Sequence, residues 1–122
     1  MNTTIHGCRK IENVNFLQKL VNERNYALLD VRSPVLYRDG TILNAPSAPL
    51  RNFTVEFIRT RKNTNKIVLI GSKADTSDLE ASIKYAISIP NPDTKETNLS
   101  YVLYEEMTGE SESHRPNKKR GR

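Results

Sequence analysis

A chain of 122 residues is long enough for one domain with a single core. Its composition, 36% hydrophobic and 27% charged, excludes disorder along the whole length, and no run approaches the roughly 18 apolar residues of a membrane-spanning helix. The lone cysteine, Cys8, cannot form an internal disulfide, and the N-terminus lacks the apolar core of a secretory signal. We therefore expect an intracellular protein, cytoplasmic or nuclear, with no membrane partner.

The net charge of +5 is concentrated at the C-terminus. Residues 111–122, SESHRPNKKRGR, hold five cations and one acid, so residues 1–110 are almost neutral. We expect a domain over residues 1–110 and a disordered basic tail over 111–122, because the tail has no apolar residue to pack. Such a tail can bind nucleic acid or an import receptor, or simply aid solubility. Its cations are Arg115, Lys118, Lys119, Arg120 and Arg122.

The first third of the chain predicts a helix, a strand and a second helix. Apolar residues on one helical face follow two asparagines that can accept backbone N–H bonds, so we expect a helix at about 13–24. YALLDV, residues 26–31, is an apolar run typical of a strand buried on both faces of a parallel sheet. Ser33 as N-cap, Pro34 at the first helical position and Gly40 as the stop predict a short helix.

The middle of the chain is less regular. Pro46 and Pro49 interrupt backbone hydrogen bonding, so residues 41–53 predict an irregular or edge strand that leads into a turn. VEFIRTRKN, residues 55–63, can form a short helix.

The second half again alternates strand and helix. KIVLI, residues 66–70, predicts a buried strand, and LSYVLY, residues 99–104, predicts another. Between them, Ser77 and Glu80 form an S-x-x-E capping box for a helix at about 78–88. Strands that alternate with helices imply an α/β fold with a parallel sheet.

The stretch LLDVRSPVLYRDGTILNAPSAPL, residues 28–50, resembles the signature of the rhodanese-like domain family. Thr41 and Asn44 depart from it, where the family usually has His and Gly. The resemblance extends over about residues 3–110 and implies a parallel five-stranded sheet flanked by helices. The closing segment SYVLYEEMTGE departs again, since Glu105, Glu106 and Met107 replace small glycines. Matches stand at Leu29, Asp30, Val31, Arg32, Tyr37, Gly40, Ile42, Ala45, Pro49 and Leu50.

An active member of this family needs a cysteine directly after the fourth strand, in a loop whose N–H groups and helix dipole stabilise a thiolate. Here Gly71 stands at that position, and Thr76 replaces an arginine that is common late in the loop. Asp75 and Asp78 oppose an anionic donor, and Lys73 is one compensating cation. The resemblance therefore implies a degenerate active-site loop: Gly71, Ser72, Lys73, Ala74, Asp75, Thr76 and Ser77.

Replacement chemistry has little support in the sequence. Ser72 needs an adjacent general base, and the histidines His6 and His114 are distant in sequence. Cys8, before the first helix, is expected to be a packing residue. Cysteine and histidine show no metal-ligand spacing, and we expect no metal or cofactor.

Asp30 and Arg32 follow the first buried strand and look catalytic at first sight. In a strand-to-helix turn, however, an acid and a base two positions apart usually cap backbone groups or pair with each other. We expect a structural role for both.

A scaffold without its nucleophile favours a catalytically inactive protein-interaction module with regulatory use, as in the non-catalytic members found in MAP-kinase phosphatases and some ubiquitin-specific proteases. LRNFTVEFIRTRKNTNK joins cations to the exposed-looking Phe53, Phe57 and Ile58 and suits an acidic partner surface. Alternatively, Phe57 and Ile58 are core and the cations a solvated face. The partner-binding candidates are Arg51, Phe57, Arg59, Arg61 and Lys62.

Two other functions stay open at this point. One is a sulfurtransferase or phosphatase-like enzyme with a displaced nucleophile, and the other is nucleic-acid binding through the basic tail.

Overall fold

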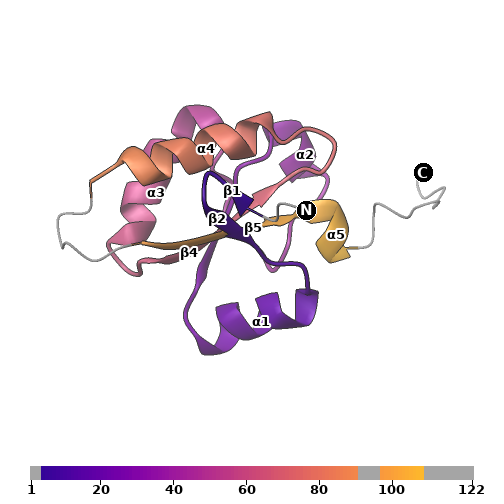
Figure 1. Cartoon of the computed structure of the whole chain (residues 1–122). Helices are drawn as coiled ribbons and strands as arrows, with labels where there is room; N and C mark the ends of the chain where they lie inside the picture. The colour runs from indigo at the N-terminus through magenta and orange to yellow at the C-terminus, as the bar shows by residue number, and fades with distance from the viewer. Residues whose placement is uncertain (1–3, 91–96, 109–122) are drawn as a thin grey trace.

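The computed structural model describes residues 4–90 and 97–108 as a five-stranded sheet flanked by helices (Figure 1). The basic tail predicted over 111–122 lies outside these residues. No helix within 4–90 or 97–108 has the length and apolar character to cross a membrane. The strands are β1 (Thr4–Ile5), β2 (Cys8–Lys10), β3 (Ala27–Asp30), β4 (Lys66–Gly71) and β5 (Asn98–Leu103); the helices are α1 (Val14–Glu23), α2 (Pro34–Arg38), α3 (Leu50–Arg61), α4 (Ser77–Ser88) and α5 (Tyr104–Thr108).

The sheet has the order β1-β2-β5-β4-β3 and is mixed, so the prediction of a purely parallel sheet is wrong. β2, β5, β4 and β3 are parallel neighbours, but β1 runs antiparallel to β2. His6 and Gly7 connect these two strands with φ values of 50° and 84°. Positive φ at both turn residues matches the right-handed twist of a hairpin, and it explains why the chain reverses here.

Two cores lie on opposite faces of the sheet. α3 and α4 cover one face, and α1 covers the other (Figure 1). Along β4, Ile67 and Leu69 pack in the cluster under α3 and α4, whereas Val68 and Ile70 pack in the cluster with α1 and α5. All four side chains are fully buried, which confirms the prediction of a strand covered on both faces.

The helix-start predictions had mixed outcomes. Asn13 caps α1 as predicted, because its side chain accepts from the N–H groups of Asn15 and Phe16 at 2.8 and 3.1 Å. The predicted capping box of Ser77 and Glu80 is wrong. The N-cap of α4 is Thr76, and the Thr76 side chain makes no capping hydrogen bond. The carboxylate of Asp75 instead accepts both the N–H and the hydroxyl of Ser77, at 3.0 and 2.6 Å.

α3 differs most from its prediction. It begins at Leu50, directly after Pro49, and so includes residues that we expected to be irregular. The ring centroids of Phe53 and Phe57 stack 5.3 Å apart, and both side chains are fully buried. The interpretation of Phe53 and Phe57 as exposed is therefore wrong. The alternative that Phe57 and Ile58 are core is right for Phe57 and wrong for Ile58, which is 40% exposed. A helix that starts at residue 50 fixes this phase, because positions 53 and 57 are one turn apart on the face toward the sheet.

The phase of α3 predicts opposite effects for two neighbouring residues. Phe57→Ala should lower the free energy of unfolding by about 3–5 kcal/mol, because it leaves a cavity in the core. Ile58→Ala should change it by about 0.5 kcal/mol or less, as is usual for surface substitutions. Urea denaturation of both variants measures this difference. Equal losses would contradict the assigned helix face.

Candidate functional site

The ends of the parallel strands β3, β4 and β5 meet at one edge of the sheet, where α/β folds usually bind ligands. A small hollow of about 80 Å³ opens there. It brings Arg32 together with part of the predicted loop. Its lining residues are Val31, Arg32, Ser33, Leu36, Gly71, Ser72, Asp75, Asp78 and Leu79.

A buried ion pair holds the end of β3. The side chains of Arg32 and Asp30 are 3% and 0% exposed, and Arg32 Nη2 donates to Asp30 Oδ2 at 2.8 Å. Arg32 Nε donates to Asp30 Oδ1 at 3.0 Å, and the hydroxyl of Thr41 donates to Oδ2 at 2.6 Å. Arg32 also donates to the Gly40 carbonyl and lies 3.9 Å from the ring centroid of Tyr104. The two charges thus pair with each other, as expected for a structural role.

Gly71 ends β4 in a space that admits no side chain. A Cβ atom placed on it would lie 2.6 Å from Leu79 Cδ2 and 2.8 Å from Leu79 Cβ. Real Cβ atoms essentially never come this close to other atoms, so Leu79 of α4 would have to move. Position 71, where the resemblance implies a cysteine in active members, is closed by the packing of α4.

The sequence analysis did not identify Glu105 of α5 as a site residue. Ser72 Oγ donates to its Oε2 at 3.0 Å, and the Lys73 N–H donates to its Oε1 at 2.7 Å. The contact joins positions 33 residues apart, so no local pattern predicts it. Its one trace in the sequence is the departure from small glycines in the closing segment.

Ser72 therefore has a carboxylate beside it, but the surrounding donors are already committed. Its Oγ also accepts the Ala74 N–H at 3.2 Å, and Ser72 is only 5% exposed. Acyl transfer needs free donors at the place where negative charge develops on the substrate. The N–H groups of Lys73 and Ala74 are instead used by Glu105 and by Ser72 itself.

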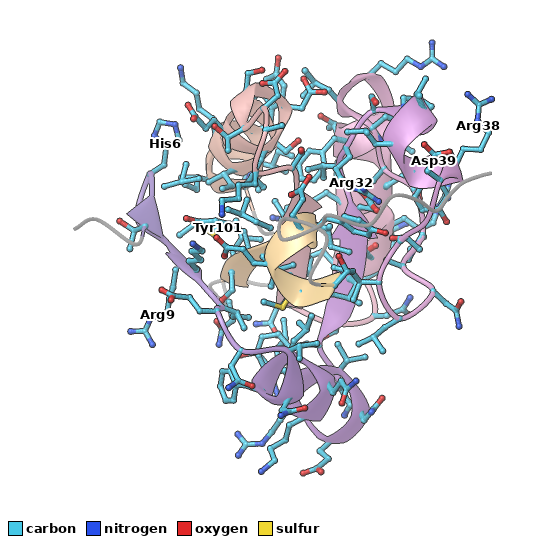
Figure 2. All side chains as sticks on the ribbon, turned by 90° about the vertical axis from the view of Figure 1, so that its right-hand side faces the viewer. His6, Arg9, Arg32, Arg38, Asp39 and Tyr101 are labelled. Carbon is cyan, nitrogen blue, oxygen red and sulfur yellow. The ribbon has the colours of Figure 1, made fainter. Side chains whose placement is uncertain are left out.

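The histidine and cysteine near the N-terminus lie elsewhere. His6 stands at the β1 end of the molecule, well apart from Arg32 in the hollow (Figure 2). Cys8 lines a separate open hollow with His6 and Ile87. Burial raises the pKa of the Cys8 thiol to about 12, so it stays protonated at neutral pH, and only the thiolate attacks sulfur donors.

The charges at the hollow do not favour a bound anion. Asp75 and Asp78 line it together with Arg32, whose charge is balanced by Asp30. The hydroxyl of Ser77, and then its N–H, lower the pKa of Asp75, so this group stays ionised. Within 4–90 and 97–108, no three His, Cys, Asp or Glu side chains are placed to hold a metal ion.

The partner-binding candidates all lie on or beside α3, but their side chains make different contacts. Arg61 donates to the carbonyls of Ile89 and Pro90 and lies 5.0 Å from the ring centroid of Phe57, so it ties α3 to the end of α4. Arg59 pairs with Glu56 at 3.0 Å. Arg51 and Lys62 are exposed.

The five candidate cations of the tail, Arg115, Lys118, Lys119, Arg120 and Arg122, lie outside the described part of the chain. Comparison of the chain with protein-family models and with curated proteins gives no match. Membership of the rhodanese-like family therefore stays a prediction from the motif residues.

The contact between Gly71 and Leu79 predicts a favourable coupling in a double-mutant cycle. Gly71→Ala should destabilise the protein by about 1–3 kcal/mol through overpacking, and Leu79→Ala by about 2–5 kcal/mol through a cavity. The double variant should lose at least about 0.5 kcal/mol less than the sum, because the new methyl group enters the space that Leu79 leaves. Guanidinium unfolding of the wild type, the two single variants and the double variant measures this coupling. Additive losses would show that Leu79 does not close over Gly71.

Proposed function

We propose that the chain is a catalytically inactive rhodanese-like module that binds a protein partner through the outer face of α3. Two backbone conformations in the motif support the resemblance. Gly40 has a φ of 144°, which suits glycine best. Asn44, at a position that the family fills with Gly, has a φ of 58°, and Asn tolerates this left-handed conformation better than most residues.

Three features support the proposed inactivity, and two of them lie at the strand-end edge, where the carboxyl ends of β3, β4 and β5 meet. Leu79 fills the space beside Gly71, Glu105 takes the loop donors, and Cys8 is a buried, protonated thiol outside the hollow. A displaced nucleophile would have to be Ser72, and its hydroxyl is held between Glu105 and Ala74. Each part of the sulfur-transfer chemistry is thus missing or engaged in packing.

One observation carries the docking proposal. Arg51, Val55, Ile58 and Lys62 follow one another at helical spacing along α3, with Arg59 beside them, and they form the α3 face. Val55 is 57% exposed and Ile58 40%. Two adjacent apolar side chains between cations are the arrangement that protein-binding helices present to a partner.

The charge of the α3 face defines the partner chemistry. Arg59 is 67% exposed, and its surface pair with Glu56 contributes about 1 kcal/mol or less, so an acidic partner group can compete for it. Arg51 and Lys62 flank the apolar pair at its two ends. We therefore propose a partner segment with an apolar side chain between acidic residues.

Two of the partner-binding candidates predicted from the sequence do not belong to the α3 face. Phe57 is fully buried in the core. Arg61 is bound to carbonyls at the end of α4. Both support the position of α3 and do not take part in the proposed contact.

Partner capture tests the α3 face with a matched pair of valines. Val55→Asp should abolish capture of a protein that the wild-type chain retains from its native source, because it puts an acid into an apolar and cationic contact. Val35→Asp is the control, since Val35 lies on α2 and is 58% exposed, almost the same as Val55. Retention measured by quantitative pull-down should also fall as salt rises.

Two results would remove the α3 face from the account. One is a retained protein that both variants capture equally well. The other is capture that depends on residues 111–122 and not on Val55, which would favour the tail.

A further inference from the structure

α5 places one carboxylate against the degenerate loop. Glu105 accepts from the Ser72 hydroxyl and from the Lys73 N–H, which are contributed by two consecutive residues. Hydrogen bonds to an ionised carboxylate are about twice as strong as neutral ones. The loop therefore presents two donors that converge on one anion, and the anion belongs to the chain itself.

Neighbouring groups hold this anion in place. Met107 of α5 is buried in the core beside α1, and the ring of Tyr104 lies on the guanidinium of Arg32. Lys10 donates to Glu106 at 2.9 Å, a bond that raises the pKa of Lys10. These contacts fix both ends of the short helix, so Glu105 has little freedom to leave the loop.

One cation of the loop lies near the residue that follows Glu105. Lys73 Nζ lies 4.0 Å from a carboxylate oxygen of Glu106, and its side chain is 54% exposed. Without Glu105, the Lys73 N–H and the Ser72 hydroxyl would lose the acceptor on which both converge. Two converging donors of this kind suit a small oxyanion.

We infer that Glu105 is an internal anion that keeps the loop closed to oxyanions from solution. Removal of its carboxylate opens an oxyanion site at Ser72 and Lys73. Asp75 and Asp78 oppose a second negative charge on the hollow side, so this site is weak. The α3 face plays no part in this inference, which concerns only the contact between Glu105 of α5 and the loop after β4.

Sulfate titration of the full chain tests this inference, with the Lys73 amide signal in NMR spectra as the readout at constant ionic strength. Glu105→Ala should give a saturable shift of that signal at least tenfold larger than in wild type. Glu106→Ala is the matched control on the same helix, because Glu106 carries the same charge and lies 4.0 Å from Lys73 Nζ, but it pairs with Lys10 and does not accept from the loop amide. It should behave as wild type does.

Two outcomes overturn the inference. One is a folded Glu105→Ala variant without a saturable shift, and the other is an equal shift in Glu106→Ala. If Glu105→Ala does not fold, Glu105→Ser also removes the carboxylate and vacates most of its space. The Lys73 amide signal of this variant should then shift saturably with sulfate. A folded Glu105→Ser variant without such a shift would also overturn the inference.

Discussion

The buried ion pair between Asp30 and Arg32 is the constraint on which the strand-end edge depends. Two charges that are almost completely buried cost several kcal/mol each to remove from water, and only good partners offset that cost. The partners come from separate parts of the chain: the hydroxyl of Thr41, the carbonyl of Gly40 and the ring of Tyr104. The pair therefore fixes β3, the following loop and α5 in one arrangement.

This arrangement engages the polar groups at the strand-end edge in contacts within the protein. Because Tyr104 is held on Arg32, the next residue, Glu105, reaches the loop after β4 and takes its donors. On the other side of the loop, α4 packs Leu79 into the space that a side chain at position 71 would need. At the edge where α/β folds usually bind ligands, only the hollow of about 80 Å³ therefore stays open within the described residues. The outer face of α3 takes no part in this packing, which leaves its apolar and cationic side chains available.

The sequence predicted those elements whose signals are local. The apolar runs predicted β3 and β4, and Asn13 predicted the start of α1. The hairpin of β1 and β2 was missed because strands of two and three residues show no period. The sequence could not decide whether Phe57 or Ile58 is core, because the buried face depends on where α3 begins, and Pro49 suggested an irregular segment up to Phe53. The contact of Glu105 with the loop was not predictable, because it is made only by the tertiary fold.

The central claim is that the strand-end edge is chemically inert, and incubation of the purified chain with thiosulfate and cyanide tests it most directly. The account predicts no thiocyanate above the blank and an unchanged intact mass, because Cys8 is a buried, protonated thiol and the hydroxyl of Ser72 is held between Glu105 and Ala74. Thiocyanate formation that is lost in Cys8→Ser or Ser72→Ala, or a persulfide on Cys8, would contradict the account.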